Sequence, residues 1–205
     1  MKFKNFIWDF DGTLVETYYH TTEALILILN KYGRTVDRKE AELSLRDSFS
    51  KAKQNFNLTD EMYKEFMDKV HELWFEPKPF VYEGVEELLL KIVERGGKNF
   101  IYTNRNHTAK LYLEQFKLDK YFADYITKES EFYSFKPSPQ AIDYLVAKHS
   151  LIKEETVMVG DREIDVLSGK SADIGAILFD EFKNKEPSAA DIIVHKISDI
   201  SKYVK

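Results

Sequence analysis

The sequence predicts an α/β protein, with a doubly wound, Rossmann-like parallel sheet and an inserted domain made only of helices. Two observations lead to this prediction. From residue 80 to residue 205, short apolar segments alternate with helical patterns, which is typical of βαβ units in a parallel sheet. Residues 15–79 carry helical patterns alone, although an apolar strand precedes them. We therefore expect an α/β core domain from residues 1–14 and 80–205, and a helical domain from residues 15–79.

The first 79 residues supply one strand and then helices. Phe3 to Trp8 are apolar and rich in β-formers, and they end at Asp9-Phe10-Asp11-Gly12, which indicates a buried strand leading into a loop. Helical patterns follow, and they are punctuated by Gly33, by an Asn-Leu-Thr-Asp turn and by Pro77. The expected helices cover residues 17–32, 39–55 and 60–75.

The remaining residues alternate between helices and strands. Gly96-Gly97 would end the helix over residues 83–95, and Pro137 would stand early in a later helix, where a missing N–H is tolerated. Helices are expected over residues 83–95, 108–116, 137–149 and 164–170. Strands are expected over residues 99–102, 125–127, 156–159, 174–179 and 192–195.

Composition excludes several classes of function. The chain has 205 residues and a formal net charge of −5, and it shows no basic stripe, so we expect no nucleic-acid partner. It has no cysteine, which excludes thiolate nucleophiles and cysteine-based zinc sites. The start of the chain does not resemble a signal peptide, and the aliphatic run Ala24 to Leu29 is too short to cross a bilayer. We expect no membrane association and a cytoplasmic location, and we leave the oligomeric state open.

Reactive side chains follow several of the predicted strands. In an open parallel sheet, ligands bind at the carboxyl ends of the strands. Asp9 and Asp11 follow the first strand, Thr103 and Asn104 follow a later one, and Asp161 ends another. Lys136 precedes a helix and could reach the same edge. Polar residues are common in loops, but four segments that bring such groups to one edge predict a site.

Asp9 and Asp11 stand two residues apart at a turn, so their carboxylates can flank one reacting centre. One would act as a nucleophile and the other as a proton donor and acceptor. A calcium loop also begins with Asp-x-Asp, but it requires Gly at its sixth position and Glu at its twelfth. Counted from Asp9, those positions hold Leu14 and His20, which excludes this alternative.

A second acidic pair, Asp161 and Asp165, lies one helical turn apart. Oxygen ligands from Asp9 and Asp161, completed by water, would suit Mg²⁺. The alternative is a pair of acids at a helix N-terminus, stabilised there by the helix dipole. Thr103 and Asn104 could hold phosphate oxygens, and Lys136 offers a cation, although each is also common in loops or on the surface.

In this order and at these spacings, the motifs resemble those of the haloacid dehalogenase-like hydrolases. The sequence DFDGTL at residues 9–14 resembles the first motif of that family, and IYTN ending at Asn104 resembles the second. Lys136-Pro137 resembles the third motif, and Gly160-Asp161 with Asp165 resembles the fourth. The resemblance covers nearly the whole chain. The phosphatases of this family with a small helical cap, such as the phosphoglycolate phosphatases and β-phosphoglucomutases, are the most similar branch.

The resemblance implies a hydrolase that acts on a small phosphorylated metabolite, a phosphate monoester. Asp9 would attack phosphorus and form an aspartyl-phosphate, and Asp11 would protonate the leaving oxygen and then deprotonate water. Mg²⁺ would be held by Asp9, Asp161 and the backbone carbonyl of Asp11, with Asp165 orienting or joining its ligands. Thr103 and Lys136 would hold the phosphoryl oxygens, assisted by Asn104.

The helical domain would then be a cap over the substrate. Arg46 could face an anionic leaving group, and Thr17 is a second candidate near the hinge. Two residues depart from the family pattern: Glu16 stands where many relatives carry Asp, and Phe135 stands where Gly is frequent.

Three alternatives remain beside the phosphatase. A β-phosphoglucomutase-like enzyme uses the same paired aspartates, but it should need an activating bisphosphate. A signalling receiver module also combines acids, Thr and Lys at a sheet edge, but its acceptor lies on a middle strand and it has no helical insertion. A non-catalytic phosphate-binding protein of the same fold is the third, and no residue in the sequence favours it.

Overall fold

A parallel sheet organises the larger part of the chain. The computed structural model describes residues 1–72, 76–183 and 188–205. They divide into two compact units, a sheet unit of residues 1–14 and 81–205 and a helical unit of residues 15–80. In the described residues of the sheet unit, the strands lie in the order β5-β4-β1-β6-β7-β8, and neighbouring strands run parallel. The predicted fold class is thereby confirmed. The strands are β1 (Asn5–Trp8), β4 (Lys98–Tyr102), β5 (Phe122–Ile126), β6 (Thr156–Gly160), β7 (Gly175–Phe179) and β8 (Ile192–Val194).

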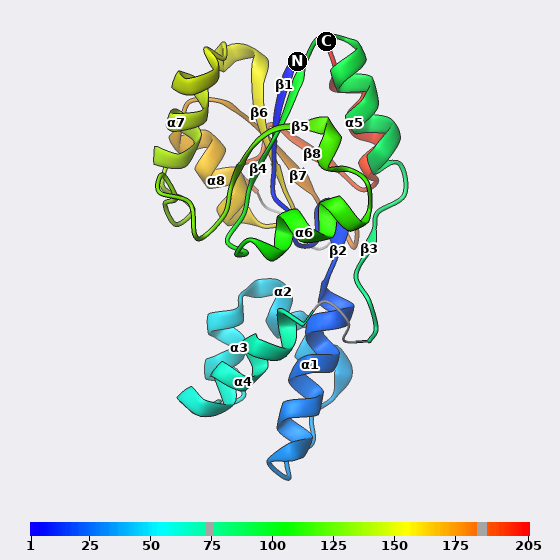
Figure 1. Cartoon of the computed structure of the whole chain (residues 1–205), viewed down its shortest axis with the longest axis vertical. Coiled ribbons are helices and arrows are strands. Elements are labelled where there is room, and N and C mark those ends of the chain that lie inside the picture. The colour runs from blue at the N-terminus through cyan, green and yellow to red at the C-terminus, as the bar shows by residue number, and fades with distance from the viewer. Residues whose placement is uncertain (73–75, 184–187) are drawn as a thin grey trace. The chain divides into compact units, whose positions relative to one another are not determined.

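Helices cover both faces of this sheet, as expected for a sheet buried on two sides. Figure 1 shows α7 and α8 on one side of the sheet, and α5 and η3 on the other. Ile7 and Phe100 face α7 and pack with Ile142 and Leu145 in one buried cluster. The helices of this unit are α5 (Val85–Glu94), α6 (Thr108–Gln115), α7 (Gln140–His149) and α8 (Glu163–Ser171), with 3₁₀ turns η1 (Asp119–Tyr121), η2 (Lys153–Glu155) and η3 (Ile197–Tyr203).

The start of α7 differs from the prediction. The helix begins at Gln140, after Pro139 as its N-cap residue, whereas a start at Pro137 was expected. A residue that precedes proline is disfavoured in helical conformation, so Pro139 keeps Ser138 out of the helix. Residues 135–138 instead form a turn in which Ser138 N donates to Phe135 O at 2.9 Å. Lys136 therefore lies in a turn and outside the helix.

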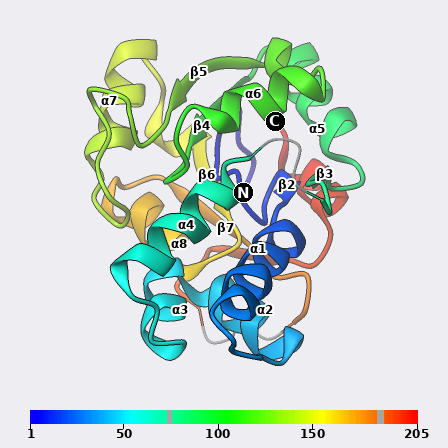
Figure 2. The same ribbon diagram turned by 60° about the horizontal axis from the view of Figure 1, so that its bottom comes forward.

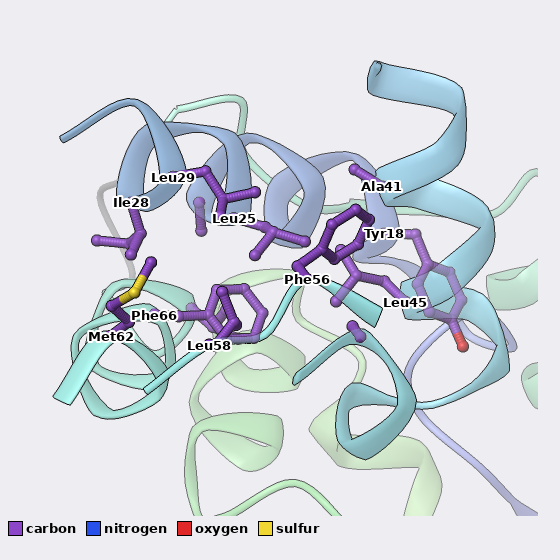
Figure 3. Close-up of a cluster of buried hydrophobic side chains, with 13 residues drawn as sticks. Tyr18, Leu25, Ile28, Leu29, Ala41, Leu45, Phe56, Leu58, Met62 and Phe66 are labelled. Atoms are coloured by element: carbon purple, nitrogen blue, oxygen red, sulfur yellow. The ribbon is translucent and has the colours of Figure 1, made fainter. Parts of the chain in front are cut away.

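The helical unit consists of α1 (Tyr18–Lys31), α2 (Arg38–Asp47), α3 (Phe49–Asn55) and α4 (Asp60–Val70). Its core is continuous, since Leu25 on α1 packs with Leu45, Phe56 and Phe66 (Figure 3). Figure 2 shows α2, α3 and α4 grouped beside α1. The short strands β2 (Val15–Glu16) and β3 (Phe80–Val81), at which the chain enters and leaves this unit, pair with each other. The expected helix over residues 60–75 ends at Val70, and residues 73–75 lie outside the described residues.

A break at Ser48 divides the single helix that was expected over residues 39–55, so that prediction was wrong. Ser48 has an extended backbone, with φ −166° and ψ 152°. Its hydroxyl accepts a hydrogen bond from Lys51 N at 3.0 Å and so caps the start of α3. Serine competes with helical structure in this way because its short side chain satisfies a backbone N–H locally.

Replacing Ser48 by Ala is expected to lower the free energy of unfolding by about 1 kcal/mol, because the first turn of α3 loses its cap. Urea denaturation followed by circular dichroism would measure this change. Ser50→Ala is the matched control, since Ser50 lies inside α3 and is exposed. Equal stability of the two variants would contradict the capping role.

Candidate active site

The register of three neighbouring strands gathers the candidate residues at one edge of the sheet. Trp8 at the end of β1 pairs with Ile101 of β4 on one side and with Val159 of β6 on the other. Each strand therefore ends at a similar level, and the residues that follow emerge together. Asp9 N continues the pairing by donating to Val159 O at 2.9 Å. The predicted convergence of polar groups at the carboxyl edge of the sheet is thus seen for the ends of β1, β4 and β6.

Lys136 connects two of the acids. Its Nζ lies 2.6 Å from Asp9 Oδ1 and 2.6 Å from Asp165 Oδ1, and all three side chains are buried. The ammonium also lies 4.8 Å from the ring centroid of Tyr102, whose hydroxyl donates to Ser134 O at 2.7 Å. The end of β4 thus holds the turn that carries Lys136 against the two carboxylates.

Burial dominates the electrostatics of this group. It raises the pKa of the Asp9 carboxyl to about 7, against the opposing attraction of Lys136 and with a further contribution from Asp165. Burial alone would lower the pKa of Lys136, but the carboxylates of Asp165 and Asp9 raise it above its ordinary value. Lys136 is therefore a cation, placed where an anionic group can be held.

Asp161 follows the end of β6, and Asp165 lies in the first turn of α8. Asp165 accepts a hydrogen bond from Arg162 N at 3.1 Å through Oδ2 while its Oδ1 contacts Lys136, so it both caps the helix and belongs to the site. Gly160 permits this arrangement. A Cβ atom there would lie 2.5 Å from Asp165 Oδ2, and closer still to the carbon atoms of that side chain.

The acidic residues fit a divalent cation. Asp9, Asp161 and Asp165 each offer a carboxylate oxygen, and these oxygens all lie within 4.8 Å of one another. Asp9 Oδ2 is buried and has no hydrogen-bond partner among the described residues. A buried carboxylate oxygen without a partner is costly unless another ligand satisfies it. Carboxylate oxygens are the donors that Mg²⁺ prefers, so these residues suit the predicted metal.

Thr103 and Asn104 lie at the end of β4 as predicted. Thr103 is buried, and its Oγ1 accepts a hydrogen bond from Arg105 N at 3.1 Å, while its hydroxyl proton meets no acceptor among the described residues. Asn104 Oδ1 accepts from the Tyr133 hydroxyl at 2.9 Å. In the described part of the chain, its amide N–H groups have no acceptor. Both residues retain donors suited to phosphoryl oxygens.

Asp11 is held by a residue that the sequence did not reveal. Arg105 Nη2 lies 2.6 Å from Asp11 Oδ1, and the guanidinium is almost fully buried. Burial would lower the pKa of Arg105, but the Asp11 carboxylate raises it. The carboxylate of Asp11 therefore faces Arg105, while the potential metal ligands are the side chains of the other three acids. The metal-binding role predicted for Asp11 involves its backbone carbonyl, so the contact between its side chain and Arg105 does not bear on that role.

The two candidates in the helical unit, Arg46 and Thr17, have their observed contacts within that unit, and their contact with a substrate stays a prediction. Arg46 lies in the last turn of α2, and its Nη2 is 2.9 Å from both Glu16 Oε1 and Glu42 Oε1. Its guanidinium also lies 4.4 Å from the ring centroid of Tyr18. Two carboxylates thus balance its charge within its own unit, and Glu16, the departure from the family pattern, is one of them. Thr17 is buried at the start of α1.

In the described part of the chain, none of the helices has the length and apolarity needed to cross a bilayer.

Comparisons with known proteins agree with the architecture. The family model described as haloacid dehalogenase-like hydrolase matches residues 6–179. A pyrophosphatase PpaX from Halalkalibacterium halodurans is 32% identical over 185 residues, which cover 85% of this chain and 82% of the relative. A pyrophosphatase PpaX from Bacillus mycoides is 28% identical and covers 98% of this chain and 96% of the relative.

Solved structures show the same likeness. The crystal structure of a hydrolase from Streptococcus pneumoniae TIGR4 is 33% identical, with a TM-score of 0.66, and the match covers 87% of this chain and 94% of that one. A HAD-superfamily hydrolase of subfamily IA from Geobacter sulfurreducens PCA is 21% identical, with a TM-score of 0.76 and 98% of each chain covered. At that identity the second match bears on the fold alone.

Proposed function

The chain belongs to the haloacid dehalogenase-like hydrolases, and on this basis we propose that it is a magnesium-dependent phosphatase with Asp9 as its nucleophile. The observation that carries the proposal is the buried Oδ2 of Asp9, which has no hydrogen-bond partner among the described residues. Lys136 binds the other oxygen of the same carboxylate and so fixes its direction. A carboxylate that is oriented, desolvated and open on one oxygen suits attack on phosphorus.

The proposed reaction has two steps, transfer of the phosphoryl group to Asp9 and then to water. The Asp9 carboxylate forms a bond to phosphorus as the bond to the leaving oxygen breaks, and Asp11 gives that oxygen a proton. Asp11 then accepts a proton from a water molecule that attacks the aspartyl-phosphate, which releases phosphate and restores Asp9. Asp11 thus returns to its starting state, and the sum of the two steps is hydrolysis.

The remaining residues bind the transferring group. Lys136 and the Thr103 hydroxyl would hold the phosphoryl oxygens, and the Asn104 amide would assist. Asp9, Asp161 and Asp165, with the backbone carbonyl of Asp11, are the proposed residues for Mg²⁺. The cation would supply positive charge that offsets the charge of the phosphoryl group. We also propose that the helical unit serves as a cap that excludes water from the site.

Two substrate classes are proposed. The names of the relatives favour inorganic pyrophosphate, because the similar proteins from Halalkalibacterium halodurans and Bacillus mycoides are pyrophosphatases by name. The sequence motifs alone favour a small organic phosphate monoester. Both undergo the same attack at phosphorus, and they differ only in the leaving group that Asp11 protonates. Substrate choice resides in groups outside this catalytic set, so it requires measurement.

Removal of metal is expected to reduce hydrolysis of both substrate classes to background. The test measures release of inorganic phosphate from pyrophosphate, p-nitrophenyl phosphate and a set of sugar and organic-acid phosphates, with Mg²⁺ or with EDTA. A higher kcat/KM for pyrophosphate would support the first class, and a higher value for one monoester would support the second. Activity that persists in EDTA would contradict the metal requirement.

Two further results would change the proposed function. If β-glucose 1-phosphate reacted only with a bisphosphate activator, and the simple esters failed, the enzyme would be a mutase. If a folded protein bound Mg²⁺ but hydrolysed none of these compounds, a non-catalytic phosphate-binding role would replace the phosphatase.

A further inference from the structure

The Arg105 guanidinium donates hydrogen bonds to both oxygens of the Asp11 carboxylate. Its Nη2 lies 2.6 Å and its Nε 3.0 Å from Asp11 Oδ1, and Nε also lies 3.2 Å from Oδ2. Arg105 is only 5% exposed and the Asp11 side chain is 21% exposed, so water is excluded from the arginine more than from the carboxylate. A planar guanidinium fork binds a carboxylate in a defined orientation, whereas a lysine would act as a point charge. The pair therefore fixes the direction of the Asp11 carboxylate as well as its distance.

Arg105 is itself held on several sides. Its guanidinium carbon lies 5.6 Å from the ring centroid of Phe10 and 5.8 Å from that of Tyr112. Its backbone N donates to Thr103 Oγ1 at 3.1 Å, and its carbonyl accepts from Lys128 N at 2.9 Å. One residue thus links the end of β4, through its backbone, to the loop after β1, through its side chain.

We propose that Arg105 is a positioning residue for Asp11, which it holds in the orientation needed for proton transfer to and from the reacting oxygens. This inference rests on the proposed function of Asp11. Arg105 acts through Asp11, and through its backbone it also steadies Thr103.

Direct binding of the phosphoryl group by Arg105 is the competing role. The donors of the guanidinium are directed at protein acceptors: Nε and Nη2 face Asp11, and Nη1 lies 3.5 Å from Thr108 Oγ1. A phosphate-binding arginine would direct its fork at the ligand. The contacts therefore favour positioning over binding.

The two roles differ in how they depend on the leaving group. Phenyl phosphate needs a proton from Asp11 as its poor leaving group departs, whereas 2,4-dinitrophenyl phosphate has a leaving group that departs without one. The ratio kcat/KM reports steps up to phosphorylation of Asp9, so it isolates this difference. We would measure it with Mg²⁺ for the wild type, Arg105→Met, Arg105→Lys, Asp11→Asn and the double variant of Asp11→Asn with Arg105→Met.

If Arg105 positions Asp11, its replacement should lower kcat/KM much more for one ester than for the other. Arg105→Met should lower kcat/KM for phenyl phosphate by about 10²-fold, within the range that general acid catalysis contributes, but by less than about threefold for 2,4-dinitrophenyl phosphate. In the Asp11→Asn background, Arg105→Met should lower kcat/KM by less than about a further threefold for either ester, because residue 11 can no longer transfer protons. Arg105→Lys should lie between wild type and Arg105→Met for phenyl phosphate alone.

Equal losses on the two esters, or losses that multiply in the double variant, would overturn the inference and indicate phosphate binding or a general structural role. Arg95→Met is the matched control, since Arg95 is exposed at the end of α5. Thermal melting would show whether Arg105→Met is folded, and Arg105→Lys provides the test if it is not. If the wild type hydrolysed neither ester, the proposed function would fail and this inference with it. A wild type that hydrolyses both esters with losses that do not depend on the leaving group would overturn the inference alone.

Discussion

Asp9→Asn is expected to lower kcat for every substrate by at least about 10⁴-fold, because an amide oxygen is a far weaker nucleophile than a carboxylate. The change keeps the shape of the side chain. It also keeps an oxygen that can accept from Lys136, which retains Asp165 as a charged partner. The folded state should therefore persist. Steady-state phosphate release measures the loss, and a covalent phosphate on the peptide containing residue 9 should appear in acid-quenched wild type only.

Asp173→Asn is the matched control for this change, because Asp173 is exposed and has a positive φ of 58° that asparagine tolerates well. It should keep wild-type kcat. A tenfold loss of kcat corresponds to about 1.4 kcal/mol in the activation barrier. If Asp9→Asn retained more than about one hundredth of the wild-type kcat, Asp9 would not be the nucleophile.

Lys136→Met is expected to have the largest effect on stability. Lys136 separates the buried carboxylates of Asp9 and Asp165, and its removal leaves both without their cation. Removing one partner from a buried ion pair typically costs about 3–5 kcal/mol, because the remaining charge is desolvated and unpaired. Urea denaturation in EDTA would measure this loss, and kcat should fall by at least about 10²-fold because a phosphoryl-oxygen donor is missing.

The destabilisation caused by Lys136→Met should increase as the pH rises. The pKa of Asp9 is about 7 in the folded protein, above the value of about 3.9 in an unfolded chain. The folded state then binds more protons than the unfolded state between these values, so this carboxyl lowers stability as pH rises through that window. Without Lys136, which opposes the shift, the loss should be smaller at pH 5 than at pH 8. A loss independent of pH would contradict this account.

A surface ion pair provides the control for Lys136→Met. Lys148 Nζ lies 2.7 Å from Asp124 Oδ2, and the lysine side chain is 45% exposed. Exposed pairs contribute little to stability because water and salt screen them. Lys148→Met is therefore expected to leave the unfolding transition unchanged, and a similar effect of both variants would argue against desolvation as the cause.

The sequence was most informative where periodicity and strand ends decide the structure. Asp9, Thr103 and Asp161 follow short apolar segments, and the parallel register brings such strand ends to one edge. Lys136 was predicted from the motif that it shares with a known family, although it lies in a turn and not at the start of a helix. The contact between Lys136 and Asp165 could not be predicted, because it depends on how the turn at residues 135–138 is held.

The features that the sequence did not reveal depend on local contacts between side chains. Arg105 follows Thr103 by two positions, and in sequence a lone arginine after a strand is indistinguishable from a solvated one. Burial of Arg105 beside two aromatic rings distinguishes it in the structure. Burial of a loop residue leaves no periodic pattern in the sequence, so this could not be predicted. The ion pair between Arg46 and Glu16 was also missed, because it joins two residues 30 positions apart. The contact of Arg46 with a substrate stays a prediction. The break at Ser48 depends on one hydroxyl.

The contact between Gly160 and Asp165 also constrains how this protein can evolve. Only a hydrogen atom fits on the Cα of residue 160 while Asp165 keeps its place. Asp165 in turn holds both Arg162 N and Lys136. A lineage that replaced this glycine would have to rebuild the helix start and the lysine contact at the same time. Single substitutions at these three positions are therefore mutually dependent, and the strand end, the acid and the lysine are expected to be inherited together.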